Sequence, residues 1–328
     1  MAGSTLRVAS VPFVSRDGDC AHNAAQVAAC LVDMAREGIA LAVFPELCLS
    51  GYTDTAKLSR ASLDALAEPL DGASIRTVAA AVERTGVACG VGLIERAPDG
   101  RLFNSYVMCL PDGARHCHRK LHAAEHRRIV SGDRYTVFDT GSGVRIGILT
   151  GGDSYLVENV RMTALLGASV LIAPHRSGRM NRTGEHPLQP LPMMYRSKSP
   201  VDTDTMESMH GWLCARAADN GMFIVFSDGH EASNDQATDA AALIVDPSGL
   251  VLATSGTSMG YVAANLDLAL IERSRGRQWL AARRPDLYAL LAQSAADRSR
   301  AYDEPPNALA RGSVALGFAV VSRHRLMR

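Results

Sequence analysis

Residues 39–46 read IALAVFPE, a run of apolar residues that closes on a proline and a glutamate. A continuous apolar run is typical of a strand that is buried on both faces of a parallel sheet. Helical apolar spacing over 21–38 precedes it and ends on Gly38, a residue common at helix C-caps. The same order recurs later, where a helix pattern over 158–168 leads into the apolar run SVLIAP (169–174). This alternation predicts a layered α/β protein in which helices cover the sheets.

The rest of the chain adds further patterns of both kinds. Strands are also expected at 6–13, 87–95, 104–110, 114–122, 135–140, 144–150, 222–228, 241–249, 250–256 and 261–268. Helices are expected at 73–86 and 205–221, with a charged helical region at 269–293. Residues 175–206 are polar and rich in proline, which is typical of a long surface insertion, here expected over the pocket mouth. We find no internal repeat, so the sequence predicts one domain over 1–293 and a tail or oligomer-contacting arm over 294–328.

Composition excludes several classes of function. The 328 residues carry 34 basic and 34 acidic side chains, a net charge of zero that gives no reason to expect a nucleic-acid partner. No apolar run reaches the roughly 18 residues of a membrane span, and the N-terminus lacks the pattern of a secretory signal. The seven cysteines are odd in number and scattered, without a CxxC pair. Reduced thiols in a cytoplasmic protein fit this usage better than disulfides do.

Ionisable residues stand where two of the expected strands end. Glu46 closes the run at 39–46, and Lys120 closes the strand at 114–122. Functional groups of α/β proteins gather at strand ends, and a buried glutamate is a candidate general base because burial raises a carboxyl pKa. A nearby lysine could offset its charge and stabilise an oxyanion. Taken alone, each also fits a plainer interpretation, a rim carboxylate and a solvated lysine.

Several ordered motifs together resemble the nitrilase, or carbon–nitrogen hydrolase, superfamily. The motifs are GIALAVFPELCLSGY (38–52), NSYVM (104–108), HRKLH (118–122), EHRRIVSGD (125–133), GDSYLVENVRMTALLGASVLIAP (152–174), ARAADNGMFIVFSDG (215–229), DPSGLVLA (246–253) and RRPDLY (283–288). The resemblance implies a four-layer α-β-β-α sandwich and a homodimer or higher homo-oligomer that acts on a small molecule. It implies neither a metal nor an organic cofactor.

The resemblance also implies a Glu-Lys-Cys triad with a second glutamate. Glu46 matches the general base, Lys120 matches the lysine that stabilises the oxyanion, and Glu125 matches the second glutamate. Gly151 stands where the nucleophilic cysteine belongs, in the stretch IGILTGGDSYLVENV (146–160). Glycine has no side-chain atom that attacks carbon, so the family's thioester route is not expected here.

Other residues near this turn have expected roles or plainer interpretations. The oxyanion and the substrate are expected to meet Gly152, Tyr52, Ser154 and His175. Asp153 is interpreted as a structural residue that holds the turn. The remaining candidates are weak: Thr150 is expected to face away, Cys48 is more simply a small buried residue, and His116 and His118 lack further metal ligands.

Three interpretations of the glycine remain open. The first is an engineered removal of the nucleophile, although Thr150, Gly152 and Val157 also depart from the family pattern and favour natural divergence. The second is an enzyme that uses Glu46 and Lys120 for acid–base chemistry on a small amide, nitrile or carbamoyl compound. The third is a binding or assembly homologue without turnover.

Overall fold

A computed structural model describes residues 5–51, 55–141, 143–176, 203–231, 241–255 and 260–293. Contacts divide the chain into two compact units, Met1–Ala281 and Ala282–Arg328. In the second unit the described residues form two 3-10 turns, Pro285–Leu287 and Ala289–Ala292. The first unit contains both sheets and every candidate site residue that the structure describes. The expected boundary at residue 293 stays a prediction.

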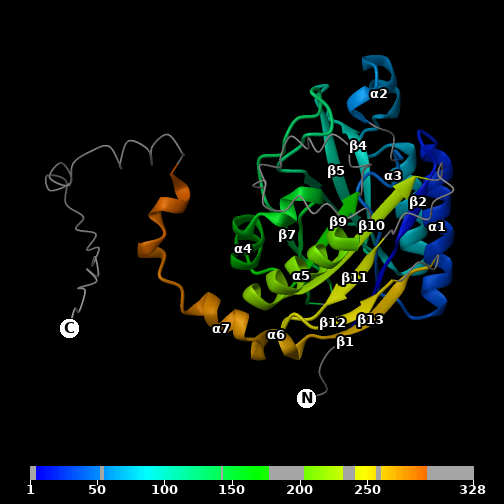
Figure 1. Cartoon of the computed structure of the whole chain (residues 1–328). Helices are drawn as coiled ribbons and strands as arrows, with labels where there is room; N and C mark the ends of the chain where they lie inside the picture. The colour runs from blue at the N-terminus through cyan, green and yellow to red at the C-terminus, as the bar shows by residue number, and fades with distance from the viewer. Residues whose placement is uncertain are drawn as a thin grey trace, which may run out of the picture. The chain divides into compact units, whose positions relative to one another are not determined.

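Two sheets form the centre of the first unit (Figure 1). In spatial order the first sheet contains β13 (Val262–Asp267), β1 (Thr5–Ser10), β3 (Leu41–Val43), β4 (Ala88–Arg96), β5 (Leu102–Cys109) and β6 (Arg115–Arg119). The second contains β12 (Val251–Thr254), β11 (Ala242–Val245), β10 (Phe223–Glu231), β9 (Val170–Arg176), β8 (Arg145–Ile148) and β7 (Thr136–Asp139), and β2 (Phe13–Ser15) pairs with β10. Strands β1, β3 and β4 are parallel, as are β8, β9 and β10.

Buried side chains show how the layers stack. One apolar cluster joins the inner faces of the two sheets, with Val43 from the first and Ile172 from the second among its members. A second cluster packs α1 (Cys20–Arg36) and α3 (Ala73–Thr85) on the outer face of the first sheet. A third packs α4 (Val157–Leu165) and α5 (Thr203–Asn220) on the second sheet. The predicted α-β-β-α sandwich is therefore confirmed.

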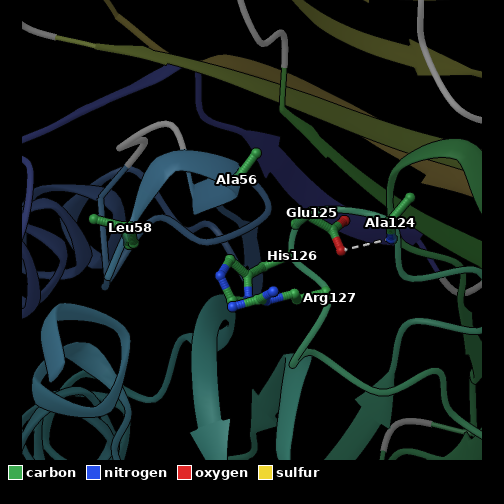
Figure 2. A pocket seen from close by; sticks show the side chains of 6 residues that line it. All are labelled: Ala56, Leu58, Ala124, Glu125, His126 and Arg127. Carbon is green, nitrogen blue, oxygen red and sulfur yellow. Dashed lines mark hydrogen bonds between the residues drawn. The ribbon is translucent and has the colours of Figure 1, made fainter. Parts of the chain in front are cut away.

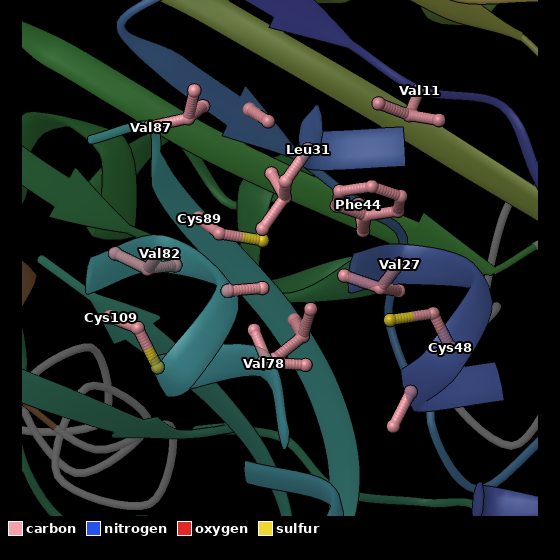
Figure 3. Close-up of a cluster of buried hydrophobic side chains, with 14 of the residues drawn as sticks. Val11, Val27, Leu31, Phe44, Cys48, Val78, Val82, Val87, Cys89 and Cys109 are labelled. Carbon is pink, nitrogen blue, oxygen red and sulfur yellow. The ribbon is translucent and has the colours of Figure 1, made fainter. Parts of the chain in front are cut away.

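Figure 3 shows the cluster between the helices and the first sheet, with valines and Leu31 around Phe44. Cys48 and Cys89 lie in this cluster and are fully buried. Burial raises the pKa of the Cys48 thiol to about 12, so this thiol is neutral at pH 7. The plainer interpretation of Cys48, as a small buried residue, is confirmed.

Some expected elements differ in the structure. The strand expected over 6–13 is split into β1 and β2 because Pro12, which has no N–H to donate, lies between them. The charged helical region at 269–293 breaks into α6 (Ala269–Arg273), α7 (Arg275–Ala281) and the two 3-10 turns, since Ser274 is extended. Short elements at η1 (Thr55–Lys57) and α2 (Arg60–Leu66) were not expected.

The insertion expected at 175–206 lies largely outside the described residues. Its first two residues belong to β9, and its last four belong to α5. Among the helices that the described residues form, none is both long and apolar enough to cross a membrane.

A close backbone approach sets the position of Glu46. The chain turns sharply after β3, where Leu47 has φ +54° and is fully buried. A Cβ on Gly92 of β4 would clash with the Leu47 nitrogen and lie 2.9 Å from the Glu46 carbonyl carbon. Only glycine permits this approach, so Gly92 allows the turn that brings Glu46 into the interior.

We expect Gly92→Ala to destabilise the fold by about 1 to 3 kcal/mol, because the added methyl group meets backbone atoms that have nowhere to move. Gly141→Ala is the matched control, since its Cβ would meet nothing within 4 Å. Urea unfolding of both variants measures the difference. Equal midpoints would show that the turn after β3 has room to adjust.

Candidate active site

Glu46, Lys120 and Glu125 meet in one buried network. The Lys120 ammonium donates to Glu46 Oε1 at 2.8 Å and also to Glu125 Oε1. The side chains are 3%, 11% and 11% exposed, respectively. The structure thus brings together the base, the lysine and the second glutamate that the resemblance implies.

Asn104, the third residue of β5, completes this network. Its Nδ2 donates to Glu46 Oε1 at 2.6 Å and to Glu125 Oε1 at 3.0 Å. Its backbone carbonyl accepts from the Lys120 N–H at 2.9 Å. Sequence reasoning did not select Asn104, although it lies in the motif NSYVM (104–108), because only the pairing of distant strands reveals its position.

Mutual contact sets the ionisation of the network. Burial alone would lower the pKa of Lys120, but the carboxylates of Glu46 and Glu125 raise it above its ordinary value. Burial would raise the pKa of Glu125, and the Lys120 ammonium outweighs this effect and lowers it. Lys120 is therefore cationic and Glu125 anionic at neutral pH.

The residue of the turn after β8 that faces this network is a glycine, Gly151. Gly151 begins the 3-10 helix η2 (Gly151–Tyr155) with φ +55°, in the left-handed region. A Cβ at this position would lie 2.7 Å from Glu46 Oε2 and 2.8 Å from Lys120 Nζ. Any side chain on residue 151 would therefore point directly at the two charged groups.

Asp153 ties this turn to the segment that carries Lys120. Its carboxylate accepts from the backbone N–H groups of Leu121 at 2.7 Å and His122 at 2.9 Å, and lies 2.8 Å from His122 Nδ1. Burial would raise the pKa of Asp153, but His118, the Leu121 N–H and His122 lower it below its ordinary value. These contacts support the expected structural role of Asp153.

The expected oxyanion and substrate residues have different surroundings. The N–H of Gly152 lies at the start of η2, where helical N–H groups have no partner within the helix. The Ser154 hydroxyl is buried and donates to the Gly151 carbonyl at 2.9 Å, so it stabilises the turn. His175 lies at the end of β9, 2.7 Å from the Tyr155 hydroxyl. Tyr52 lies outside the described residues.

A cavity of about 370 Å³ opens beside Glu125 (Figure 2). It is lined by Ala56, Leu58, Ala124, Glu125, His126 and Arg127. The Ala124 N–H donates to Glu125 Oε2 at 3.1 Å, which fixes the carboxylate between the cavity and Lys120. Glu125 therefore connects the buried network to a space of ligand size. In the described part of the chain, no three His, Cys, Asp or Glu side chains gather as a metal site requires.

Comparisons with known proteins place the chain in a family. A family model described as carbon-nitrogen hydrolase matches residues 7–275. An (R)-stereoselective amidase from Pseudomonas sp. is 31% identical over 82% of this chain and 88% of its own length. The human omega-amidase NIT2 is 24% identical over 68% of this chain and 78% of that protein.

Solved structures share the fold. A carbon-nitrogen hydrolase from Helicobacter pylori G27 aligns with a TM-score of 0.73 at 20% identity, over 88% of this chain and 99% of that one. An amidase from Nesterenkonia sp. aligns with a TM-score of 0.63 at 20% identity, over 85% and 98%.

We expect Asp153→Asn to lower the free energy of unfolding by about 2 to 3 kcal/mol at pH 7, because the amide cannot accept all the bonds of the carboxylate. The pKa of Asp153 is lowered by folding, so its contribution is present above about pH 4 and is lost as the pH falls through the folded value. Urea unfolding at pH 7 and pH 3.5 measures both values. A difference between the proteins that is the same at the two pH values would contradict this role.

Proposed function

The chain belongs to the carbon-nitrogen hydrolase family, and on this premise we propose that it hydrolyses a small amide without a covalent intermediate. The network of Glu46, Lys120 and Glu125 is the observation that carries the proposal. Burying three ionisable groups costs several kcal/mol per ion unless they are well paired, so a purely structural use is expensive. The names of two relatives, a stereoselective amidase and an omega-amidase, support an amide substrate.

In this proposal Gly151 occupies the position of the family's nucleophile. The direction of its absent side chain, toward Glu46 and Lys120, supports the assignment. Its left-handed backbone supports it too, because a nucleophile on a sharp strand-to-helix turn needs a strained conformation. With no atom to attack carbon at this position, water takes over that task.

Each group has one task in the proposed step. Glu46 Oε2 accepts a proton from water as the water oxygen adds to the carbonyl carbon of the amide. Lys120 and the N–H of Gly152 stabilise the negative charge on the carbonyl oxygen. The C–N bond then breaks, the nitrogen takes up a proton, and a carboxylate and an amine or ammonia leave. Glu125 holds Lys120 and borders the cavity that receives the rest of the substrate.

A second candidate function is ligand binding without turnover. The observation that favours it is that the charged groups of the network already bond one another. Lys120 donates to both carboxylates, and Asn104 donates to both as well. Such a site is satisfied before any substrate arrives. Assembly as a homodimer or larger homo-oligomer and a cytoplasmic location stay predictions in either case.

We expect the native chain to release ammonia from at least one member of a panel of small primary amides and nitriles. Glu46→Gln should lower this turnover by about 10²- to 10⁴-fold, because the amide side chain cannot accept the water's proton. Glu83→Gln on the exposed face of α3 is the control and should retain full activity. If Glu46→Gln keeps full activity, the assignment of the base is wrong. If no substrate is hydrolysed but one stabilises the fold thermally, the binding function gains support.

We expect Gly151→Cys to form an acyl-enzyme adduct with the same amides, which mass spectrometry of acid-stopped samples detects on residue 151. The new thiol would lie beside Glu46, which can take its proton. Its Cβ would lie 2.7 Å from Glu46 Oε2 and 2.8 Å from Lys120 Nζ, so the ends of both side chains must shift, and the left-handed backbone would cost about 1 to 2 kcal/mol more. The native chain should form no adduct, and Glu46→Gln in the cysteine background should abolish it. Gly141→Cys controls for ordinary thiol chemistry. Absence of an adduct would place the family's nucleophile position elsewhere.

A further inference from the structure

Three side chains from three elements form a second polar chain near Gly151. The Tyr155 hydroxyl of η2 lies 2.7 Å from His175 Nε2, and His175 Nδ1 lies 3.3 Å from Asp228 Oδ1. His175 is 13% exposed and Asp228 is fully buried, and the Gly229 N–H also bonds Asp228 Oδ1 at 2.9 Å. Of these three residues, the sequence analysis named only His175 as a candidate site residue.

Strand register places this chain at the same sheet edge as Gly151. Ile148 of β8 pairs with Ile172 of β9, and Gly151 and His175 each follow three residues later. His175 pairs in turn with Asp228 on β10. These strands are parallel, so their carboxyl ends meet at one edge, where α/β proteins bind ligands.

The charges of the first network also affect the pKa of Tyr155. Burial raises the pKa of its phenol, and the negative charges of Asp228 and Glu46 raise it further, while Lys120 opposes them. Tyr155 is therefore a neutral phenol at physiological pH. It retains a proton that it can donate.

The hydrogen-bond partners fix the direction of the protons. A carboxylate only accepts, so His175 Nδ1 donates to Asp228. In a neutral imidazole Nε2 then accepts from the Tyr155 hydroxyl, whereas in an imidazolium Nε2 donates to the Tyr155 oxygen. Protonation of His175 thus frees the Tyr155 proton for another acceptor.

We propose that Tyr155, His175 and Asp228 form a proton relay that supplies the leaving nitrogen of the substrate with its proton. This inference rests on the proposed amide hydrolysis and adds a second acid to it. As the C–N bond breaks, the Tyr155 hydroxyl proton moves to nitrogen, and the His175 Nε2 proton moves to the Tyr155 oxygen. Glu46 meanwhile holds the proton taken from water, which returns through solvent to His175, so all protons balance.

The first network explains why a separate acid is useful. Glu46 Oε1 already accepts bonds from Lys120 and Asn104, which leaves Oε2 to receive the water's proton. Without a second acid, Glu46 Oε2 would have to accept the water's proton and then deliver it to the leaving nitrogen of the amide. With a relay, the two proton transfers use different groups.

Charged and titratable groups surround the relay. Among the described residues, His175 contacts Tyr155 and Asp228, Arg176 follows it on β9, and Arg216 of α5 donates to the Tyr155 carbonyl. The proposed step needs a carboxylate at Glu46 to take the water's proton and a proton on His175 Nε2 to replace the one that Tyr155 gives up.

The test compares two leaving groups in His175→Gln and Tyr155→Phe, with His22→Gln on α1 as the control. For an alkyl amide that the native chain hydrolyses, we expect both relay variants to lose about 10²- to 10⁴-fold in kcat with little change in KM. For the p-nitrophenyl ester of the same acid, whose leaving group needs no proton, we expect near-native rates. Equal losses on amide and ester would show a structural role and overturn the relay.

A second measurement is independent of turnover. Nitrogen-15 NMR of the ligand-free protein should find a proton on His175 Nδ1, the nitrogen that faces Asp228, and Asp228→Asn and Tyr155→Phe should each shift the His175 signals. An Nδ1 without a proton, or no response to these substitutions, would overturn the relay even if amides are hydrolysed. If neither amide nor ester is hydrolysed by the native chain, the proposed function fails, and the catalytic role of the relay fails with it.

Discussion

The contact of one buried ammonium with two buried carboxylates is the constraint on which the rest of the site depends. Removing three charges from water is costly, and the cost is offset only when each group keeps its partners in place. Lys120 therefore needs Glu46 and Glu125 at hydrogen-bond distance, and both carboxylates need the amide of Asn104. The surrounding backbone is arranged to hold these positions, even at the strained residue Leu47.

The sandwich supplies the site from both of its sheets. Glu46 follows β3 and Lys120 follows β6 in the first sheet, whereas Gly151 and His175 lie at the ends of β8 and β9 in the second. Asp153 connects the two sides, since it belongs to the turn after β8 and binds the backbone that follows Lys120. The apolar cluster between the sheets thus fixes the distance between Glu46 and the turn.

The sequence predicted those parts of the protein that depend on local pattern. The apolar runs at 39–46 and 169–174 contain β3 and most of β9, because strands buried on both faces exclude polar residues. The motifs also identified Glu46 and Lys120, which the structure brings together. Local pattern does not report long-range pairing, which is why Asn104 and Asp228 were missed. For the same reason, the helical spacing of charged residues over 269–293 did not reveal that the helix is interrupted at Ser274.

The glycine at position 151 has a consequence for chemical resistance. Enzymes that depend on a reactive thiolate are inactivated by peroxide, by heavy metals and by alkylating reagents. Burial raises the pKa of all seven thiols, which keeps them neutral at pH 7. If amides are hydrolysed without a thiolate, as we propose, oxidants and alkylating reagents should leave this turnover intact.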